Sequence, residues 1–120
     1  MDKKIIFLDL DVTLTNDEKK VTPLTQKALL EMQKAGHIVV LASGRPTPGI
    51  LPVAKAVELE KFGGYIMAFN GGKIINAKTN EVVFEQVLDR KYISPLLKYA
   101  KENDIGLITY DDKRIIVGTR

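Results

Sequence analysis

The sequence predicts an α/β fold with a parallel sheet core, followed by a smaller α+β element. Residues 5–10 and 37–42 are short, nearly continuous apolar runs, as in strands covered on both faces. A helical pattern of apolar residues lies between them, so strand, helix and strand form a βαβ unit with a right-handed crossover. After residue 72 the pattern changes to hairpins and one further helix, which predicts the α+β element.

The first helix has signals at both ends. Thr22-Pro23 predicts an N-cap followed by proline at the first helical position, and Gly36 predicts a left-handed residue after the last turn. The apolar residues that recur along it predict a buried face of Leu24, Ala28, Met32 and Ala35.

The later elements follow in order. A second helix is expected over 47–60, interrupted by Gly49 and Pro52, and a third strand over 65–69. Asn70-Gly71-Gly72 is a strong turn signal. The remaining expected elements are a hairpin over 73–86, a helix over 90–103 and a hairpin over 105–117.

Composition excludes several classes of protein. The 120 residues contain no cysteine, so a disulfide framework or a thiolate site is impossible. The net charge is +3 and the basic residues are scattered among acids, which argues against a nucleic-acid partner. No apolar run has the length of a membrane span, and the first residues do not have the pattern of a signal peptide. We expect a soluble cytoplasmic protein without a membrane partner.

Two carboxylates lie at the end of the first strand. Asp9 and Asp11 end it, and Ser43-Gly44 ends the second strand, so both pairs are expected at the ligand-binding edge of the sheet. Adjacent acids repel unless a cation joins them, and Mg²⁺ favours one or two carboxylates with water and phosphate. This combination indicates phosphoryl transfer, whereas an isolated Asp-x-Asp is more often a turn.

These residues carry a resemblance to a known family. DLDVTLTN (9–16) resembles the first motif, D-x-D-x-T, of the haloacid dehalogenase (HAD) superfamily, and LASGRP (41–46) resembles its second motif. With FNGGKII (69–75) after the third strand, the chain is similar to the Cof-type sugar-phosphate phosphatases.

The resemblance implies a role for each motif residue. Asp9 is the expected nucleophile, which forms an aspartyl-phosphate and binds Mg²⁺. Asp11 is the expected general acid/base and also gives Mg²⁺ its backbone carbonyl. Ser43 and Gly44 are expected to bind the phosphoryl group of a small phosphorylated metabolite. Thr13 is expected to support the nucleophile loop.

Three further positions can be compared with the pattern of the same family. Arg45 and Asn70 are expected at the substrate rim, although Asn70 is equally explained as a turn residue with positive φ. Val12 stands where the family most often has glycine, a departure that we interpret as tolerated.

The resemblance also implies a domain division. We expect a HAD-like Rossmannoid core over 1–85, including the hairpin 73–86, and the start of an α/β cap over 86–120. The family's third-motif lysine and fourth acidic motif are not found before Arg120, and Asp111-Asp112 is interpreted as a solvated turn. The chain is therefore expected to be an N-terminal portion whose first strand is an exposed edge that promotes self-association.

Two other functions stay open at this point. The first is a catalytically incomplete fragment with only a binding or regulatory role. The second is a response-regulator receiver, which carries its phosphorylated Asp on a middle strand, but the second and third strands here end without one. His37, the single histidine, begins a strand and is expected to pack or to face solvent.

Overall fold

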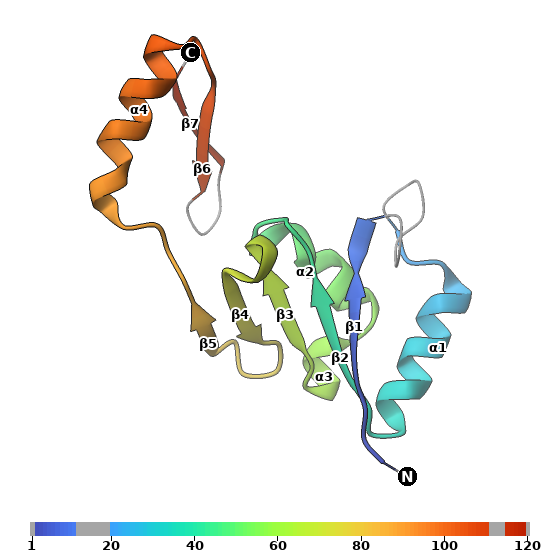
Figure 1. Ribbon diagram of the computed structural model, residues 1–120. Helices are drawn as coiled ribbons and strands as arrows, with labels where there is room; N and C mark the ends of the chain where they lie inside the picture. The colour runs from blue at the N-terminus through green and yellow to red at the C-terminus, as the bar shows by residue number, and fades with distance from the viewer. Residues whose placement is uncertain (1, 12–19, 111–114, 120) are drawn as a thin grey trace. The chain divides into compact units, whose positions relative to one another are not determined.

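A computed structural model describes residues 2–11, 20–110 and 115–119 of the chain. The chain divides into two compact units, Met1–Glu85 and Gln86–Arg120, which are described separately (Figure 1). The assignment of the second unit as the start of a cap stays a prediction. In chain order the elements are β1 (Ile5–Asp9), α1 (Pro23–Lys34), β2 (Ile38–Ala42), α2 (Thr47–Ala56), α3 (Leu59–Phe62), β3 (Tyr65–Ala68), η2 (Phe69–Gly71), β4 (Lys73–Asn76), β5 (Val82–Glu85), η3 (Arg90–Tyr92), α4 (Ile93–Glu102), β6 (Leu107–Tyr110) and β7 (Ile115–Thr119).

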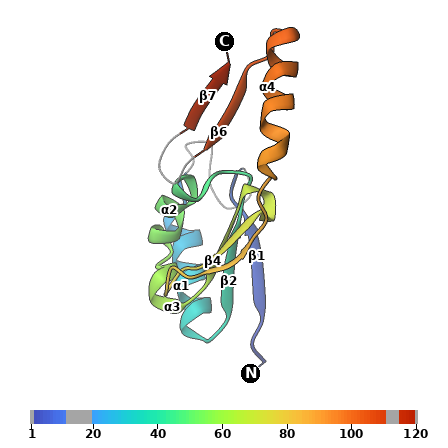
Figure 2. The ribbon, with the colours of Figure 1, turned by 90° about the vertical axis from the view of Figure 1, so that its left-hand side faces the viewer.

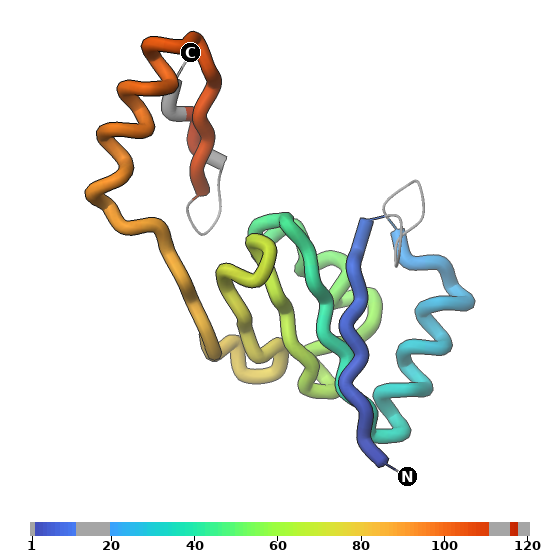
Figure 3. Tube along the Cα trace, in the orientation of Figure 1, coloured from blue at the N-terminus to red at the C-terminus, as the bar shows by residue number. Residues whose placement is uncertain are grey.

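The first unit contains a mixed sheet of order β1-β2-β3-β4-β5. β1, β2 and β3 are parallel, while β4 and β5 form an antiparallel hairpin at the other side. The chain trace shows β1 at one edge of this sheet (Figure 3). The α/β class predicted from the sequence is therefore confirmed.

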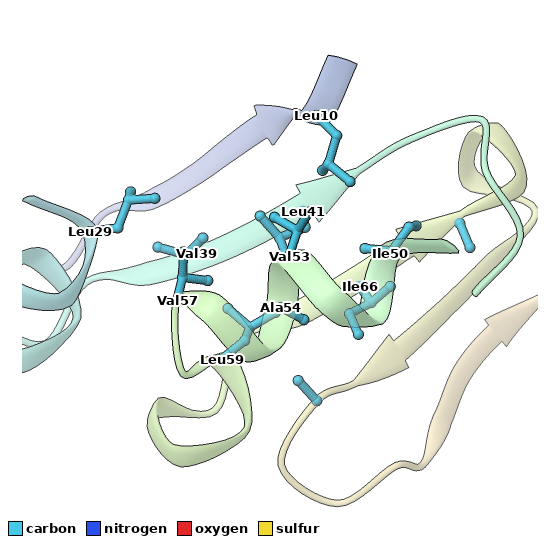
Figure 4. Packing of buried hydrophobic residues seen from close by; sticks show 12 residues of the cluster. Leu10, Leu29, Val39, Leu41, Ile50, Val53, Ala54, Val57, Leu59 and Ile66 are labelled. Atoms are coloured by element: carbon cyan, nitrogen blue, oxygen red, sulfur yellow. The ribbon is translucent and has the colours of Figure 1, made fainter. Parts of the chain in front are cut away.

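The helices α1, α2 and α3 lie on one face of the sheet (Figure 2). Their apolar side chains pack against those of β2 and β3 in a single cluster, in which Leu41, Ile50 and Leu59 are fully buried (Figure 4). The expectation that the first strand is covered on both faces is wrong. Along β1 exposed and half-buried residues alternate, with Phe7 61% exposed, because successive side chains of a strand point to opposite faces.

The ends of α1 are those predicted. The Thr22 side chain accepts a hydrogen bond from the backbone N–H of Thr25 at 3.4 Å, and Pro23 occupies the first turn. Gly36 has φ +99°, the left-handed conformation that follows many helices. Local chemistry therefore fixes both ends of the helix.

The buried face of α1 differs from the predicted one, which was Leu24, Ala28, Met32 and Ala35. Leu24 is 81% exposed, whereas Leu29 and Gln33 are buried. Of the predicted residues, Met32 is half-buried and packs against the core. The Gln33 side chain donates a 2.8 Å hydrogen bond to the carbonyl oxygen of Val57 on the neighbouring segment. Because this polar contact takes part in orienting the helix, an apolar count could not find the correct face.

The second predicted helix is divided at a different place. α2 includes both Gly49 and Pro52, and the interruption falls at Glu58, which has φ +52° and precedes α3. Pro52 has no N–H for the carbonyl of Pro48 four residues earlier, but both prolines are exposed, so water can satisfy that carbonyl.

The turn between β4 and β5 confirms the predicted hairpin. The Asn76 side-chain oxygen accepts hydrogen bonds from the backbone N–H groups of Lys78 and Thr79, at 2.9 and 3.2 Å. Asn80 then has φ +62°, a left-handed conformation that asparagine tolerates well.

The second unit consists of η3, α4 and the antiparallel pair β6-β7, as the sequence predicts. Among its described residues, Ala100 on α4 is the buried apolar side chain, while Tyr92, Leu96 and Tyr99 are exposed. Within the described part of the whole chain, no helix has the length and apolar character needed to cross a membrane.

Candidate functional site

The candidate site begins at the carboxyl ends of the parallel strands. Asp9 is the last residue of β1 and lies in register with Ala42, the last residue of β2. Ser43 follows directly and donates its backbone N–H to the carbonyl oxygen of Met67 on β3, at 3.0 Å. The strand ends thus place Asp9 and Ser43 at one edge of the sheet, where open α/β sheets bind ligands.

Asp11 joins the second strand end through an ion pair. The Arg45 guanidinium donates to Oδ1 of Asp11 and, through its other terminal nitrogen, to the carbonyl oxygen of Gly49 at 3.0 Å. The Arg45 side chain is 23% exposed and that of Asp11 is 51% exposed. Such a solvated pair contributes only about 0–1 kcal/mol to stability. Its importance is geometric, since it links the loops that follow β1 and β2.

The Ser43-Gly44 segment offers hydrogen-bond donors. Ser43 is buried, and its Oγ accepts the backbone N–H of Arg45 at 3.0 Å, which leaves the hydroxyl proton to be donated to a ligand. In the described part of the chain the Gly44 N–H has no hydrogen-bond partner. α2 begins at Thr47, and the positive end of its dipole favours an anion nearby.

Asn70 lies against Gly44. A Cβ placed on Gly44 would be 3.0 Å from Oδ1 of Asn70, so the two residues are in close contact. Asn70 has φ +55°, which bears out the turn interpretation, and the same conformation places its side chain beside the segment that ends β2. The turn interpretation of Asn70 is thus confirmed, and its place at a substrate rim stays a prediction.

The structure brings Asp11, Ser43, Gly44, Arg45 and Asn70 together, with Asp9 at the adjoining strand end. Thr13 and Val12, named above for the nucleophile loop, lie outside the described residues. The motifs gave no indication of the Phe69 N–H, which donates to the Arg45 carbonyl at 3.0 Å, or of the Gly49 carbonyl that holds the guanidinium. These are backbone groups, which side-chain motifs cannot reveal.

The donor set at the sheet edge agrees with what Mg²⁺ requires. Asp9 would supply a carboxylate oxygen and Asp11 its backbone carbonyl oxygen, and this ion commonly takes one or two carboxylates, with water and phosphate completing its octahedron. Over residues 2–11, 20–110 and 115–119, no group of three or more His, Cys, Asp or Glu side chains is placed to hold a metal. Among the described residues, Asp9 and Asp11 are those that would hold the ion, with ligand oxygens beside them.

Comparison with known proteins identifies the family. Residues 6–120 match the model of the haloacid dehalogenase-like hydrolases, and the chain belongs to this family. A crystal structure of a haloacid dehalogenase-like hydrolase from Bacteroides thetaiotaomicron superposes with a TM-score of 0.91 at 40% identity, over 97% of this chain and 44% of that one. The resemblance drawn from the motifs is confirmed.

Two proteins of Bacillus subtilis are also similar in sequence. YxeH, whose name carries a provisional phosphatase assignment, is 32% identical over 98% of this chain and 43% of its own length. YcsE, a 5-amino-6-(5-phospho-D-ribitylamino)uracil phosphatase, is 32% identical over 68% of this chain and 32% of its own. The chain thus spans less than half the length of these relatives.

Proposed function

We propose that the chain carries the nucleophile and phosphoryl-binding part of a Mg²⁺-dependent phosphatase, acting on sugar phosphates or similar small phosphorylated metabolites. The observation that carries this proposal is the arrangement at the carboxyl edge of the sheet. There Asp9 ends β1, the buried hydroxyl of Ser43 follows β2, and Asp11 is tied to Arg45. Membership of the hydrolase family and the phosphatase names of relatives support the same activity.

The residues divide the reaction between them. A carboxylate oxygen of Asp9 attacks phosphorus and forms an aspartyl-phosphate, while the bond from phosphorus to the leaving oxygen breaks and Asp11 donates a proton to that oxygen. Asp11 then takes a proton from the water that attacks the aspartyl-phosphate, which releases inorganic phosphate and restores Asp9. Ser43 and the Gly44 N–H donate hydrogen bonds to the phosphoryl oxygens throughout. A bound Mg²⁺, held by Asp9 and Asp11, would neutralise negative charge.

The substrate class rests on the chemistry of the site and on one relative. Hydrogen-bond donors of Ser43 and Gly44 suit a phosphate monoester, and Arg45 and Asn70 stand at the rim where the alcohol part would lie. YcsE is named for a substrate whose phosphate is carried by a ribityl group. We therefore assign small phosphorylated polyols and sugars to this site.

Hydrolysis of p-nitrophenyl phosphate by the purified chain, with and without Mg²⁺, tests the activity. Any turnover by this chain, in which the third-motif lysine and fourth acidic motif are not found, is expected to require Mg²⁺ and to fall at least about a hundredfold in Asp9→Asn, because an amide oxygen is a far weaker nucleophile. Asp89→Asn is a control of the same chemistry, since Asp89 caps η3 in the second unit. Equal turnover in wild type and Asp9→Asn would contradict the mechanism.

The same measurement distinguishes the alternative role. A chain that binds inorganic phosphate at Ser43 and Gly44 but shows no turnover with Mg²⁺ would be a binding or regulatory module. Binding is read from the amide signals of these residues in ¹H–¹⁵N spectra. Absence of both turnover and phosphate binding would contradict either function.

A further inference from the structure

Three consecutive residues after β3 have left-handed backbone conformations. Phe69, Asn70 and Gly71 have φ of +52°, +55° and +94°. L-residues adopt this region at an energetic cost, and glycine and asparagine bear it best. Such conformations persist when neighbouring contacts hold them, and they concentrate at functional sites. The contacts that hold this turn therefore indicate what it does.

The turn is tied to the segment that ends β2. The backbone N–H of Asn70 donates to the Ser43 carbonyl oxygen at 3.0 Å, and the N–H of Phe69 donates to the Arg45 carbonyl oxygen at 3.0 Å. The left-handed conformations direct two successive N–H groups toward the same loop, an arrangement that recurs in backbone nests. Here the nest receives two carbonyl oxygens of the protein itself.

The first of these hydrogen bonds determines where a neighbouring donor points. In a planar trans peptide the C=O and the following N–H point in opposite directions. The Ser43 carbonyl points at Asn70, so the Gly44 N–H, which belongs to the same peptide, points away from the turn. Within the described residues that N–H has no partner. It is held as a fixed donor at the site.

We propose that Asn70 is a positioning residue, acting through its left-handed backbone to present the Gly44 N–H to a phosphoryl oxygen. Its amide side chain is not the element that binds the ligand. The inference rests on the proposed function for the identity of the ligand, and it adds how the binding loop is held in shape. It predicts that binding follows the backbone preference at position 70 rather than the presence of an amide.

Two substitutions separate backbone conformation from side chain. Asn70→Gly removes the amide but keeps the left-handed conformation accessible, whereas Asn70→Val disfavours that conformation because valine is β-branched. Inorganic phosphate is titrated into each ¹⁵N-labelled chain while the Gly44 amide signal is followed. We expect the Kd of Asn70→Gly to stay within about twofold of wild type and that of Asn70→Val to rise about tenfold, as the docked turn becomes less populated.

Asn80 provides a matched control. It is an asparagine with φ +62° in the β4–β5 turn, and its N–H donates to Asn76 rather than to the site. Asn80→Val introduces the same backbone conflict and is expected to lower the melting temperature while leaving the phosphate Kd unchanged. A merely destabilising substitution is thus distinguished from one that disturbs the loop.

Three results would contradict the inference. Binding weakened equally in Asn70→Gly and Asn70→Val would show that the amide contacts the ligand, and would overturn the inference. Unchanged binding in Asn70→Val would overturn it as well, with the proposed function intact. A wild-type chain whose Gly44 signal does not respond to phosphate would contradict the proposed function together with this inference.

Discussion

Among the described glycines, Gly64 has the least space for a side chain. It lies just before β3, and a Cβ built on it would be 2.3 Å from the carbonyl oxygen of Val39 and 2.5 Å from Cδ1 of Leu59. Contacts below 3 Å with a backbone atom cannot be relieved by turning a side chain. The close approach of α3 to β2 therefore depends on the absence of a side chain at this position.

Gly64→Ala is expected to destabilise the chain by about 2–4 kcal/mol, because α3 or β2 must move to admit the methyl group. Urea denaturation followed by circular dichroism measures the change in the free energy of unfolding. Gly72→Ala is the control, since Gly72 has φ −69°, which any residue adopts. A loss below about 0.5 kcal/mol in Gly64→Ala, the range typical of surface substitutions, would show that the close contact is absent.

At the scale of elements, two glutamines connect α1 to the end of α2. Gln26 donates to the Ala56 carbonyl oxygen at 2.6 Å, and Gln33 donates to the Val57 carbonyl oxygen at 2.8 Å. These carbonyls lie at the carboxyl end of α2, where helices leave acceptors without partners in the helix. The two side chains belong to α1, and they satisfy carbonyl groups at the carboxyl end of α2 as a C-cap does.

Gln33→Ala is expected to cost about 1–3 kcal/mol, because Gln33 is buried and its loss leaves a buried carbonyl without its donor. Gln26→Ala removes the same chemical group from a half-buried position, where water can replace the donor, and should cost less. Thermal melts of both variants give the comparison. A larger loss in Gln26→Ala than in Gln33→Ala would contradict the importance of burial here.

At the scale of the whole molecule, no described strand pairs with the outer edge of β1. Among the described strands β1 pairs with β2 alone, and Ile5 and Phe7 on it are exposed. An open, apolar edge strand is a template for pairing with another chain. An antiparallel pair of two β1 strands would place Lys3 and Lys4 of each copy toward Asp9 and Asp11 of the other, so the charges are complementary.

The chain is therefore expected to self-associate, with the average mass in sedimentation equilibrium rising as concentration increases. Phe7→Lys should shift the chain toward monomer, because it places a charge on the pairing strand. Leu24→Lys is the control, since Leu24 is 81% exposed and belongs to α1 rather than to the pairing strand. A wild-type chain that is monomeric at all concentrations would contradict this prediction.

Features encoded by neighbouring residues could be predicted from the sequence. The cap at Thr22, the left-handed Gly36 and the Asn76 turn are local, so a few residues contain all their interactions. The placement of Asp9 and Ser43 at one edge was predictable for a related reason, since parallel strands joined by a helix end at the same side of a sheet. The class of fold and the edge that carries the site follow from such local signals.

The tertiary structure alone decided the rest, because these features depend on residues far apart in the chain. The Asp11–Arg45 pair joins positions separated by 34 residues, and the exposure of Leu24 follows from the face of α1 that α2 engages. The sequence by itself determined which residues could carry the chemistry and at which strand ends they stand. Only the tertiary structure decided how the segment after β2 is held, because the backbone hydrogen bonds from Phe69 and Asn70 to Arg45 and Ser43 join separate segments.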